Sequence, residues 1–234
     1  MDETYNLKAF IISRESFREF DSKVTVYSSE KGKLDLVARG TKKLKSKLAA
    51  HIEPISLSNL MAVRGKSFDY IGSATLEEGF ANIKIDYDKI ETAGRGIEMF
   101  NNLIKNEEKD EEIFKFLGEF FDVLSKNKNF DHELTSSFFS LGLFSRLGFK
   151  PELYHCVNCG KKLVPKGNRI GFDKGGVICE NCARGHEPEI SENGIKVMRL
   201  GFEKKLSELI NLKIEDKARG EAVNLAGSFV KYHF

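Results

Sequence analysis

Short runs of alternating apolar and polar residues fill the first eighty positions of the chain. Five of them are rich in β-branched and aromatic residues: LKAFIIS at 7–13, SKVTVYSS at 22–29, GKLDLVARG at 32–40, ISLSNLMAVRG at 55–65 and SFDYIGSATLEE at 67–78. Such runs between turn residues predict β-strands, with a hairpin turn at SSEKGK, 28–33. Five strands with an insertion after the third predict a small closed barrel such as an OB-fold, although another five-stranded barrel fits the same pattern.

From about residue 82 the apolar spacing becomes that of helices. Apolar residues recur at 113, 117, 120 and 124 in IFKFLGEFFDVL, and at 134, 138, 141 and 144 in LTSSFFSLGLFSRLG. This spacing places them on one face of a helix. Gly148 predicts the end of the second helix, and Ser191 predicts the cap of a later one. A Phe-rich core is expected from Phe114, Phe116, Phe120, Phe121, Phe138, Phe139 and Phe144.

The composition is that of a soluble globular protein, with 41% hydrophobic and 31% charged residues in 234. The longest apolar run, FFSLGLF at 138–144, is far shorter than the roughly 18 residues that indicate a membrane span. Acidic residues stand at the N-terminus, where a secretory signal would carry bases. We therefore expect a cytoplasmic protein without membrane contact, and in that reducing compartment clustered cysteines argue against structural disulfides.

All four cysteines form two closely spaced pairs, Cys156-x2-Cys159 and Cys179-x2-Cys182, with nineteen residues between the pairs. A Cys-x-x-Cys turn places two thiolates about 4 Å apart, as on one edge of a tetrahedron around Zn²⁺. Gly160 suits the tight turn after the first pair. The spacing predicts two zinc knuckles that face each other and hold one structural Zn²⁺.

Other chemistries fit these cysteines less well. A thioredoxin-like site uses a single pair, a catalytic zinc keeps a coordination position that four thiolates would fill, and the His-x-Glu of zinc deaminases does not occur in the sequence. An iron–sulfur cluster could use four cysteines, but paired knuckles favour zinc. We interpret His155 and His186 as exposed loop residues. The surrounding bases offset the charge of the site: Lys161, Lys162, Lys166, Arg169, Lys174 and Arg184.

A basic segment follows the third predicted strand. We call ARGTKKLKSKLAAHIEP, 38–54, the basic arm, and its bases the arm cations: Arg39, Lys42, Lys43, Lys45 and Lys47. Charge runs are commonly only solvated surface. Here, however, the run leaves a strand of a predicted OB barrel, where an electrostatic track for single-stranded nucleic acid is often built. The arm cations are therefore candidate nucleic-acid-binding residues.

Three segments together resemble the RecO family of bacterial recombination mediators. They are GKLDLVARGTKKLKSKLAAHIEP at 32–54, LGFKPELYHCVNCG at 147–160 and FDKGGVICENC at 172–182. The first is similar to the family's strand and basic arm. The others match its Gly-aromatic-x-Pro-x-Leu before one cysteine pair and its Gly-Gly before the next. TAGRGIEMFNNLI, 92–104, departs from the Leu/Tyr/Glu-rich helix usual in the family.

The resemblance implies an α+β multi-domain protein with an N-terminal five-stranded OB-fold barrel over 1–80. An all-helical domain over 81–151 and 187–234 would follow, with an inserted zinc ribbon of four cysteine ligands over 152–186. It also implies binding of single- and double-stranded DNA, annealing of complementary strands, and loading of RecA together with RecR. The C-terminal tail of single-strand-binding protein is a further implied partner, and the protein would associate with the nucleoid during repair.

The sequence shows no pattern typical of bond-making or bond-breaking chemistry. It has no Walker loop, no nuclease-type carboxylate cluster and no nucleophile with a base nearby. We therefore expect a non-enzymatic DNA-binding mediator of recombinational repair. The alternative is an RNA-binding OB and zinc-ribbon protein of translation or transcription, whereas a metal-dependent enzyme conflicts with a zinc shell filled by four thiolates.

Overall fold

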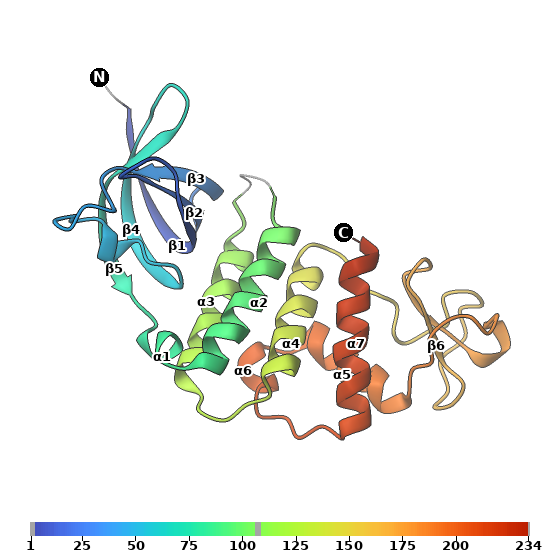
Figure 1. The fold of residues 1–234 in the computed structure, drawn as a ribbon. Coiled ribbons are helices and arrows are strands. Elements are labelled where there is room, and N and C mark those ends of the chain that lie inside the picture. The colour runs from blue at the N-terminus through green and yellow to red at the C-terminus, as the bar shows by residue number, and fades with distance from the viewer. Residues whose placement is uncertain (1–2, 106–108, 234) are drawn as a thin grey trace. The chain divides into compact units, whose positions relative to one another are not determined.

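A computed structural model describes residues 3–105 and 109–233 (Figure 1). The chain divides into two compact units. The first comprises Met1–Ala93 and Ile104–Lys126, and the second comprises Gly94–Leu103 and Asn127–Phe234. The first unit holds the strands that the alternating runs predict, and the second holds both cysteine pairs.

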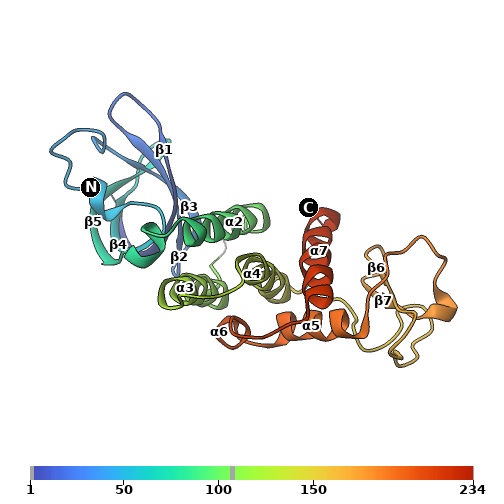
Figure 2. The same cartoon turned by 60° about the horizontal axis from the view of Figure 1, so that its bottom comes forward.

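The five predicted strands are confirmed and close into a barrel. They are β1 (Thr4–Ser16), β2 (Ser22–Ser28), β3 (Gly32–Ala38), β4 (Ser56–Val63) and β5 (Asp69–Glu78). Their order around the barrel is β1-β2-β3-β5-β4. The β3–β5 pair is parallel and the other pairs are antiparallel. This is the five-stranded OB-fold that the sequence suggested (Figure 2).

Strand β1 buries side chains on both of its faces. Leu7, Ala9 and Ile11 join the barrel core with residues of the other strands, because alternate residues of a strand point to the same side. Phe10 lies between them and points the other way, where its ring lies 4.9 Å from that of Phe114 and 5.7 Å from that of Phe121. The barrel therefore carries helix α3 (Glu111–Lys126) on its outer surface.

Helix α3 presents the apolar face that its sequence predicts. The residues at 113, 117, 120 and 124 are all buried. A glycine lets the helix approach β1, because a Cβ at Gly118 would lie 3.0 Å from the Phe10 ring. Short helix α1 (Ala81–Lys84) precedes it in this unit, and Phe80 beside α1 has its ring 5.4 Å from that of Phe121. Helix α2 (Tyr87–Leu103) is divided between the units after Ala93.

The second unit is a helical bundle with a small ribbon. Its helices are α4 (His132–Arg146), α5 (Glu192–Glu203), α6 (Leu206–Leu209) and α7 (Asp216–His233). Helix α4 packs against α5, α6 and α7, and its predicted face at 134, 138, 141 and 144 is buried. The predicted cap at Ser191 is confirmed, because its hydroxyl accepts the N–H of Gly194.

A buried ring cluster holds the bundle together. The Phe144 ring meets that of Phe229 edge-on at 5.0 Å, and the other Phe residues of α4, Phe138 and Phe139, are buried as well. The expected Phe-rich core is thus confirmed. No helix in the described parts of the chain is long and apolar enough to cross a membrane.

Candidate nucleic-acid interface and metal centre

The two cysteine pairs meet at the end of a two-stranded ribbon. Strands β6 (Arg169–Gly171) and β7 (Gly176–Ile178) pair antiparallel, and the second pair follows β7 with a 3-10 turn over Glu180–Cys182. The first pair forms a tight turn, in which the Gly160 N–H donates to the Cys156 carbonyl at 2.8 Å. Gly160 adopts a φ of 70°, the left-handed conformation that favours glycine.

The four sulfur atoms lie within 4.8 Å of one another. The Sγ atoms of Cys159 and Cys179 are 3.8 Å apart, which is too long for a disulfide. It matches the roughly 3.8 Å edge of a tetrahedron whose Zn–S bonds are about 2.3 Å. The pattern of two facing knuckles is therefore realised in the fold, and the four thiols fit a single tetrahedral Zn²⁺.

Hydrogen bonds prepare one of these sulfurs to carry negative charge. Burial acts to raise the pKa of Cys156, but the N–H groups of Cys179, Cys159 and Asn158 outweigh it and lower that pKa to about 6. Hydrogen bonds with the side chains of Cys179 and Cys159 raise the pKa of Cys182 to about 12. A bound cation such as Zn²⁺ would favour the thiolate form of all four.

The two nearby histidines lie outside this cluster, as expected. Both His155 and His186 are exposed, and each has its nearest carboxylate on a neighbouring glutamate, Glu152 at 3.7 Å and Glu187 at 3.8 Å. Of the bases around the cysteines, Arg169 pairs with Glu189 at 2.8 Å.

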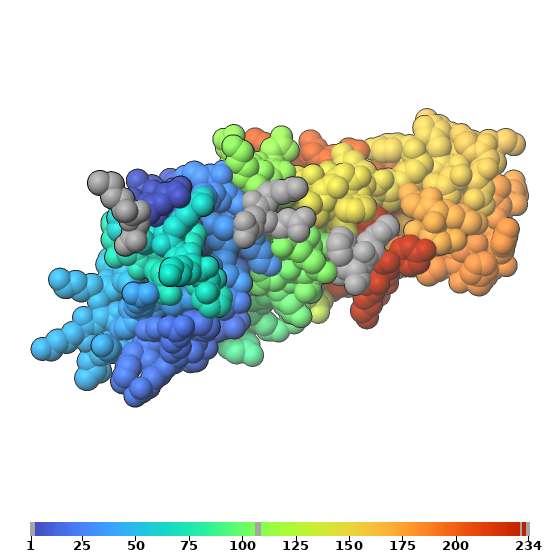
Figure 3. Space-filling model, turned by 90° about the horizontal axis from the view of Figure 1, so that it is seen from above, coloured from blue at the N-terminus to red at the C-terminus, as the bar shows by residue number. Residues whose placement is uncertain are grey.

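The basic arm leaves the barrel after β3 and returns to it before β4. Its outward part projects from the barrel as a loop (Figure 3, light blue). The arm contains a 3-10 turn over Ala49–His51. Its return leg is fixed by apolar contacts, because Ile52 is completely buried in the barrel core and Leu48 packs against that core.

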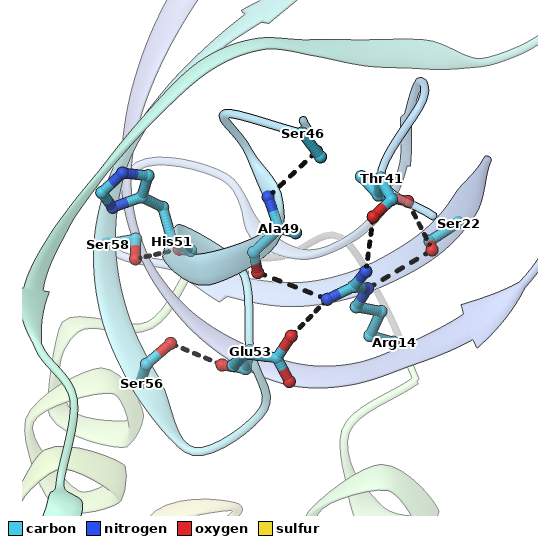
Figure 4. A network of polar contacts seen from close by, with 9 residues as sticks. All are labelled: Arg14, Ser22, Thr41, Ser46, Ala49, His51, Glu53, Ser56 and Ser58. Carbon is cyan, nitrogen blue, oxygen red and sulfur yellow. Dashed lines mark hydrogen bonds and ion pairs between the residues drawn. The ribbon is translucent and has the colours of Figure 1, made fainter. Parts of the chain in front are cut away.

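Arg14 of β1 ties the two ends of the arm together (Figure 4). Its guanidinium donates to the Thr41 carbonyl, where the arm begins, and to the Ala49 carbonyl, where it returns, both at 3.3 Å. It also forms an ion pair with Glu53 and donates to the Ser22 hydroxyl. Because these acceptors surround its guanidinium, Arg14 positions the arm instead of adding to its charge.

The arm cations are all exposed. None of them pairs with a carboxylate within residues 3–105 and 109–233. Arg39 stacks over the Tyr70 ring at 3.8 Å, the Lys42 Nζ donates to the Arg18 carbonyl at 2.8 Å, and Lys43 lies over the Phe20 ring. The fold thus gathers positive charge on one projecting loop and leaves it without compensating acids.

A groove of about 800 Å³ in the same unit adds further bases. Its lining includes Lys31 and Lys33 around the start of β3, and Arg64 and Lys66 from the β4–β5 turn, together with the acids Glu30, Asp35 and Asp69. We did not single out Arg64 and Lys66 from the sequence. Their signal is RGK between the fourth and fifth strands, because OB-folds bind oligonucleotides with this loop as well as with the β1–β2 loop.

Comparison with known proteins agrees with this architecture. The family model described as "Recombination protein O N terminal" matches residues 1–80, and the one described as "Recombination protein O C terminal" matches residues 85–234. The second match covers more than half of the chain. The chain belongs to the RecO family.

Relatives named "DNA repair protein RecO" match nearly the whole chain. The protein of Desulforamulus reducens is 28% identical over 232 residues, which cover 98% of this chain and 89% of that protein. The protein of Roseiflexus sp. is 28% identical, and the match covers 99% of this chain and 81% of that protein. That of Dehalococcoides mccartyi is 29% identical and covers 93% and 85%.

Membership in the RecO family places the chain in recombinational DNA repair. RecO proteins are repair mediators and not a family of enzymes. This agrees with the absence of catalytic motifs from the sequence. Because a mediator acts by binding, the exposed arm is a candidate surface for this role.

Proposed function

We propose that this chain is a DNA-binding recombination mediator. It binds single- and double-stranded DNA, anneals complementary strands and helps to load RecA together with RecR. The observation that carries the proposal is the basic arm, whose cations are exposed and lack carboxylate partners in residues 3–105 and 109–233. Cations of this kind on an OB-fold barrel form an electrostatic track for the phosphates of a single strand.

The arm and the neighbouring groove suggest how two strands are brought together. Two complementary strands repel each other through their phosphates, so annealing requires positive charge near both. The arm cations would hold one strand, and the lysines and arginine of the groove would lie close to the second. Because phosphates carry no base identity, this mode of binding is independent of sequence.

The zinc ribbon has a structural role in this proposal. The limits proposed for the parts are 1–80 for the OB barrel, 152–186 for the ribbon, and 81–151 with 187–234 for the helical domain. Four thiolates leave Zn²⁺ no open position for a substrate. The metal would stabilise the ribbon, because its binding contributes to the free energy of folding.

An annealing assay tests the proposal. Complementary labelled oligonucleotides are coated with the matching single-strand-binding protein, and pairing is followed by energy transfer with and without this chain. We expect faster pairing with the chain present, and single-stranded DNA should compete for binding at least as well as RNA of the same sequence. No acceleration of pairing, or a clear preference for RNA, contradicts the proposal and favours a role in translation or transcription.

The second unit offers a site for the tail of single-strand-binding protein. A groove of about 230 Å³ is lined by Met99, Val223 and Ala226, with Arg95 and Glu133 at the same site. An acidic tail that ends in an apolar aromatic would place that side chain among the apolar residues and its carboxylate near the arginine. Titration calorimetry should show tighter binding of the native tail peptide than of a peptide without its last residues, and a Val223→Glu variant should lose the difference.

A further inference from the structure

Three large apolar side chains stand exposed on two turns of the barrel and on the basic arm. Phe20 is 45% exposed on the β1–β2 turn, Phe68 is 40% exposed on the β4–β5 turn, and Leu44 of the arm is fully exposed. We call these residues the base platform. Large exposed apolar side chains are normal when isolated, but a group beside unpaired cations indicates a binding surface.

Contacts through the β1–β2 turn link the platform to the arm. The Phe17 ring meets the Phe68 ring edge-on at 5.4 Å. The Lys42 N–H donates to the Phe20 carbonyl at 3.1 Å, and the Lys43 Nζ lies 5.4 Å from the centre of the Phe20 ring. The turn thus holds the Phe20 ring next to Lys43 of the arm, and the Phe17 ring against Phe68.

We propose that Phe20, Leu44 and Phe68 contact the bases of the single strand whose phosphates the arm holds. This inference rests on the proposed function and adds how the single-stranded state is recognised. Aromatic rings next to cations bind single strands because every base has a face on which a ring can stack. In a duplex those faces are covered by neighbouring base pairs, so the platform favours single strands.

The arrangement is also compatible with annealing. A base that stacks on a ring contributes its face and leaves its pairing edge free. Leu44 can contribute in the same way, because apolar side chains insert between bases in other DNA-binding proteins. A complementary strand can then pair with bases that the platform holds apart from one another, and no sequence preference results.

Removal of the rings should remove most of the contribution of the bases to binding. The wild type and the Phe20→Ala/Phe68→Ala variant are compared on oligo-dT and on an abasic strand of the same length, which carries the same phosphates without bases. We expect the wild type to bind oligo-dT at least about thirtyfold more tightly than the abasic strand, since two rings each stack on a base and the lower end of the usual stacking contribution, taken twice, corresponds to that ratio. The variant should lose most of this preference, because only Leu44 of the base platform remains, and it should keep the wild-type salt dependence.

A matched control separates this effect from a general loss of exposed aromatic surface. Tyr87 is 79% exposed on α2, and Tyr87→Ala should leave the preference for oligo-dT unchanged. The Leu44 side chain is fully exposed. A Leu44→Ser variant should therefore reduce the preference for oligo-dT over the abasic strand without changing thermal unfolding. If the double variant unfolds, Phe68→Leu tests the ring while retaining an apolar side chain.

The outcomes distinguish the inference from the function on which it rests. If the wild type binds abasic and normal strands equally well, or the variant keeps the preference, the platform does not contact bases although DNA binding stands. If the wild type binds neither strand, the proposed function itself is contradicted, and the inference fails with it.

Discussion

Neutralising three arm lysines should flatten the salt dependence of single-strand binding. Each phosphate contact on a single strand contributes a slope of about −0.7 to log K against log salt. If four arm cations engage, the slope is about −3. Replacing Lys42, Lys43 and Lys45 together with Gln should reduce its magnitude by about two. Gln retains most of each side chain, so the change removes charge and little else.

The same arithmetic gives the loss of affinity. A slope reduced by about two corresponds to roughly 100-fold weaker binding at 0.1 M salt, if the affinities converge near 1 M. The loss should be similar on all base sequences, because phosphates carry no base identity. Zinc content and thermal unfolding should stay unchanged, since these side chains are exposed. The contacts given up are the Lys42 hydrogen bond to the Arg18 carbonyl and the Lys43 contact with the Phe20 ring, both at the surface.

Fluorescence anisotropy of a labelled strand across a salt series measures both quantities. The matched control replaces the exposed ribbon residues Lys161, Lys162 and Lys166 with Gln. This control removes the same number of positive charges from another surface. An unchanged slope in the arm variant refutes the reasoning. An equal decrease in the ribbon variant does so as well, because it would show a response to net charge and not to the arm.

Three further predictions concern stability. Purified protein should contain one zinc per chain by metal analysis, and Cys179→Ser should lose it and unfold with several kcal/mol less free energy. Asp131 caps α4, because its side chain accepts the Leu134 N–H. Burial acts to raise the pKa of Asp131, but hydrogen bonds from Arg219 and from the Leu134 N–H outweigh burial and lower this pKa. The ionised carboxylate of Asp131 should therefore add to the free energy of unfolding at pH values above the ordinary carboxyl pKa, and this contribution should be lost as pH falls through the lowered pKa. Chemical denaturation at a series of pH values measures it, and Asp131→Asn should remove this pH dependence. Burial raises the pKa of Tyr27 from 10.0 to about 12, so stability should fall as pH rises through that interval, and Tyr27→Phe should be less sensitive.

The barrel was predictable because the alternating runs reflect a direct physical requirement. One face of each strand must be buried, so period two is visible in the sequence. The run Ala9-Phe10-Ile11-Ile12 breaks that alternation. The structure explains why, since Phe10 packs outward onto α3. A continuous apolar stretch in a strand was thus a signal for a second buried face, which we did not use.

The clustering of the four cysteines was predictable for a different reason. Cysteine spacing encodes the local turn geometry, and the two pairs need only one hairpin to meet. Arg14 could not be found in this way. It lies near the C-terminal end of β1 and bonds to Thr41, Ala49 and Glu53, far along the chain. Nothing in the local pattern around Arg14 differs from that of an exposed strand residue, because its role arises from barrel closure.

The geometry also predicts which phosphate and base contacts depend on each other. The Lys43 Nζ lies 5.4 Å from the centre of the Phe20 ring, so removing either group changes the position of the other. Lys45 makes no ring contact in the parts of the chain that the structure describes. Effects of groups in contact couple, whereas those of separated groups add within about 0.3–0.5 kcal/mol.

A pair of double-mutant cycles on oligo-dT checks this expectation. The Lys43→Gln and Phe20→Ala changes should couple by about 0.5–1 kcal/mol, the magnitude of an exposed cation–π contact. The Lys45→Gln and Phe68→Ala changes should be additive in binding free energy, because the first acts on a phosphate and the second on a base. Equal coupling in both cycles contradicts this division of roles. It would mean that the arm and the barrel turns respond to DNA as one rearranging surface, which the tether through Arg14 argues against.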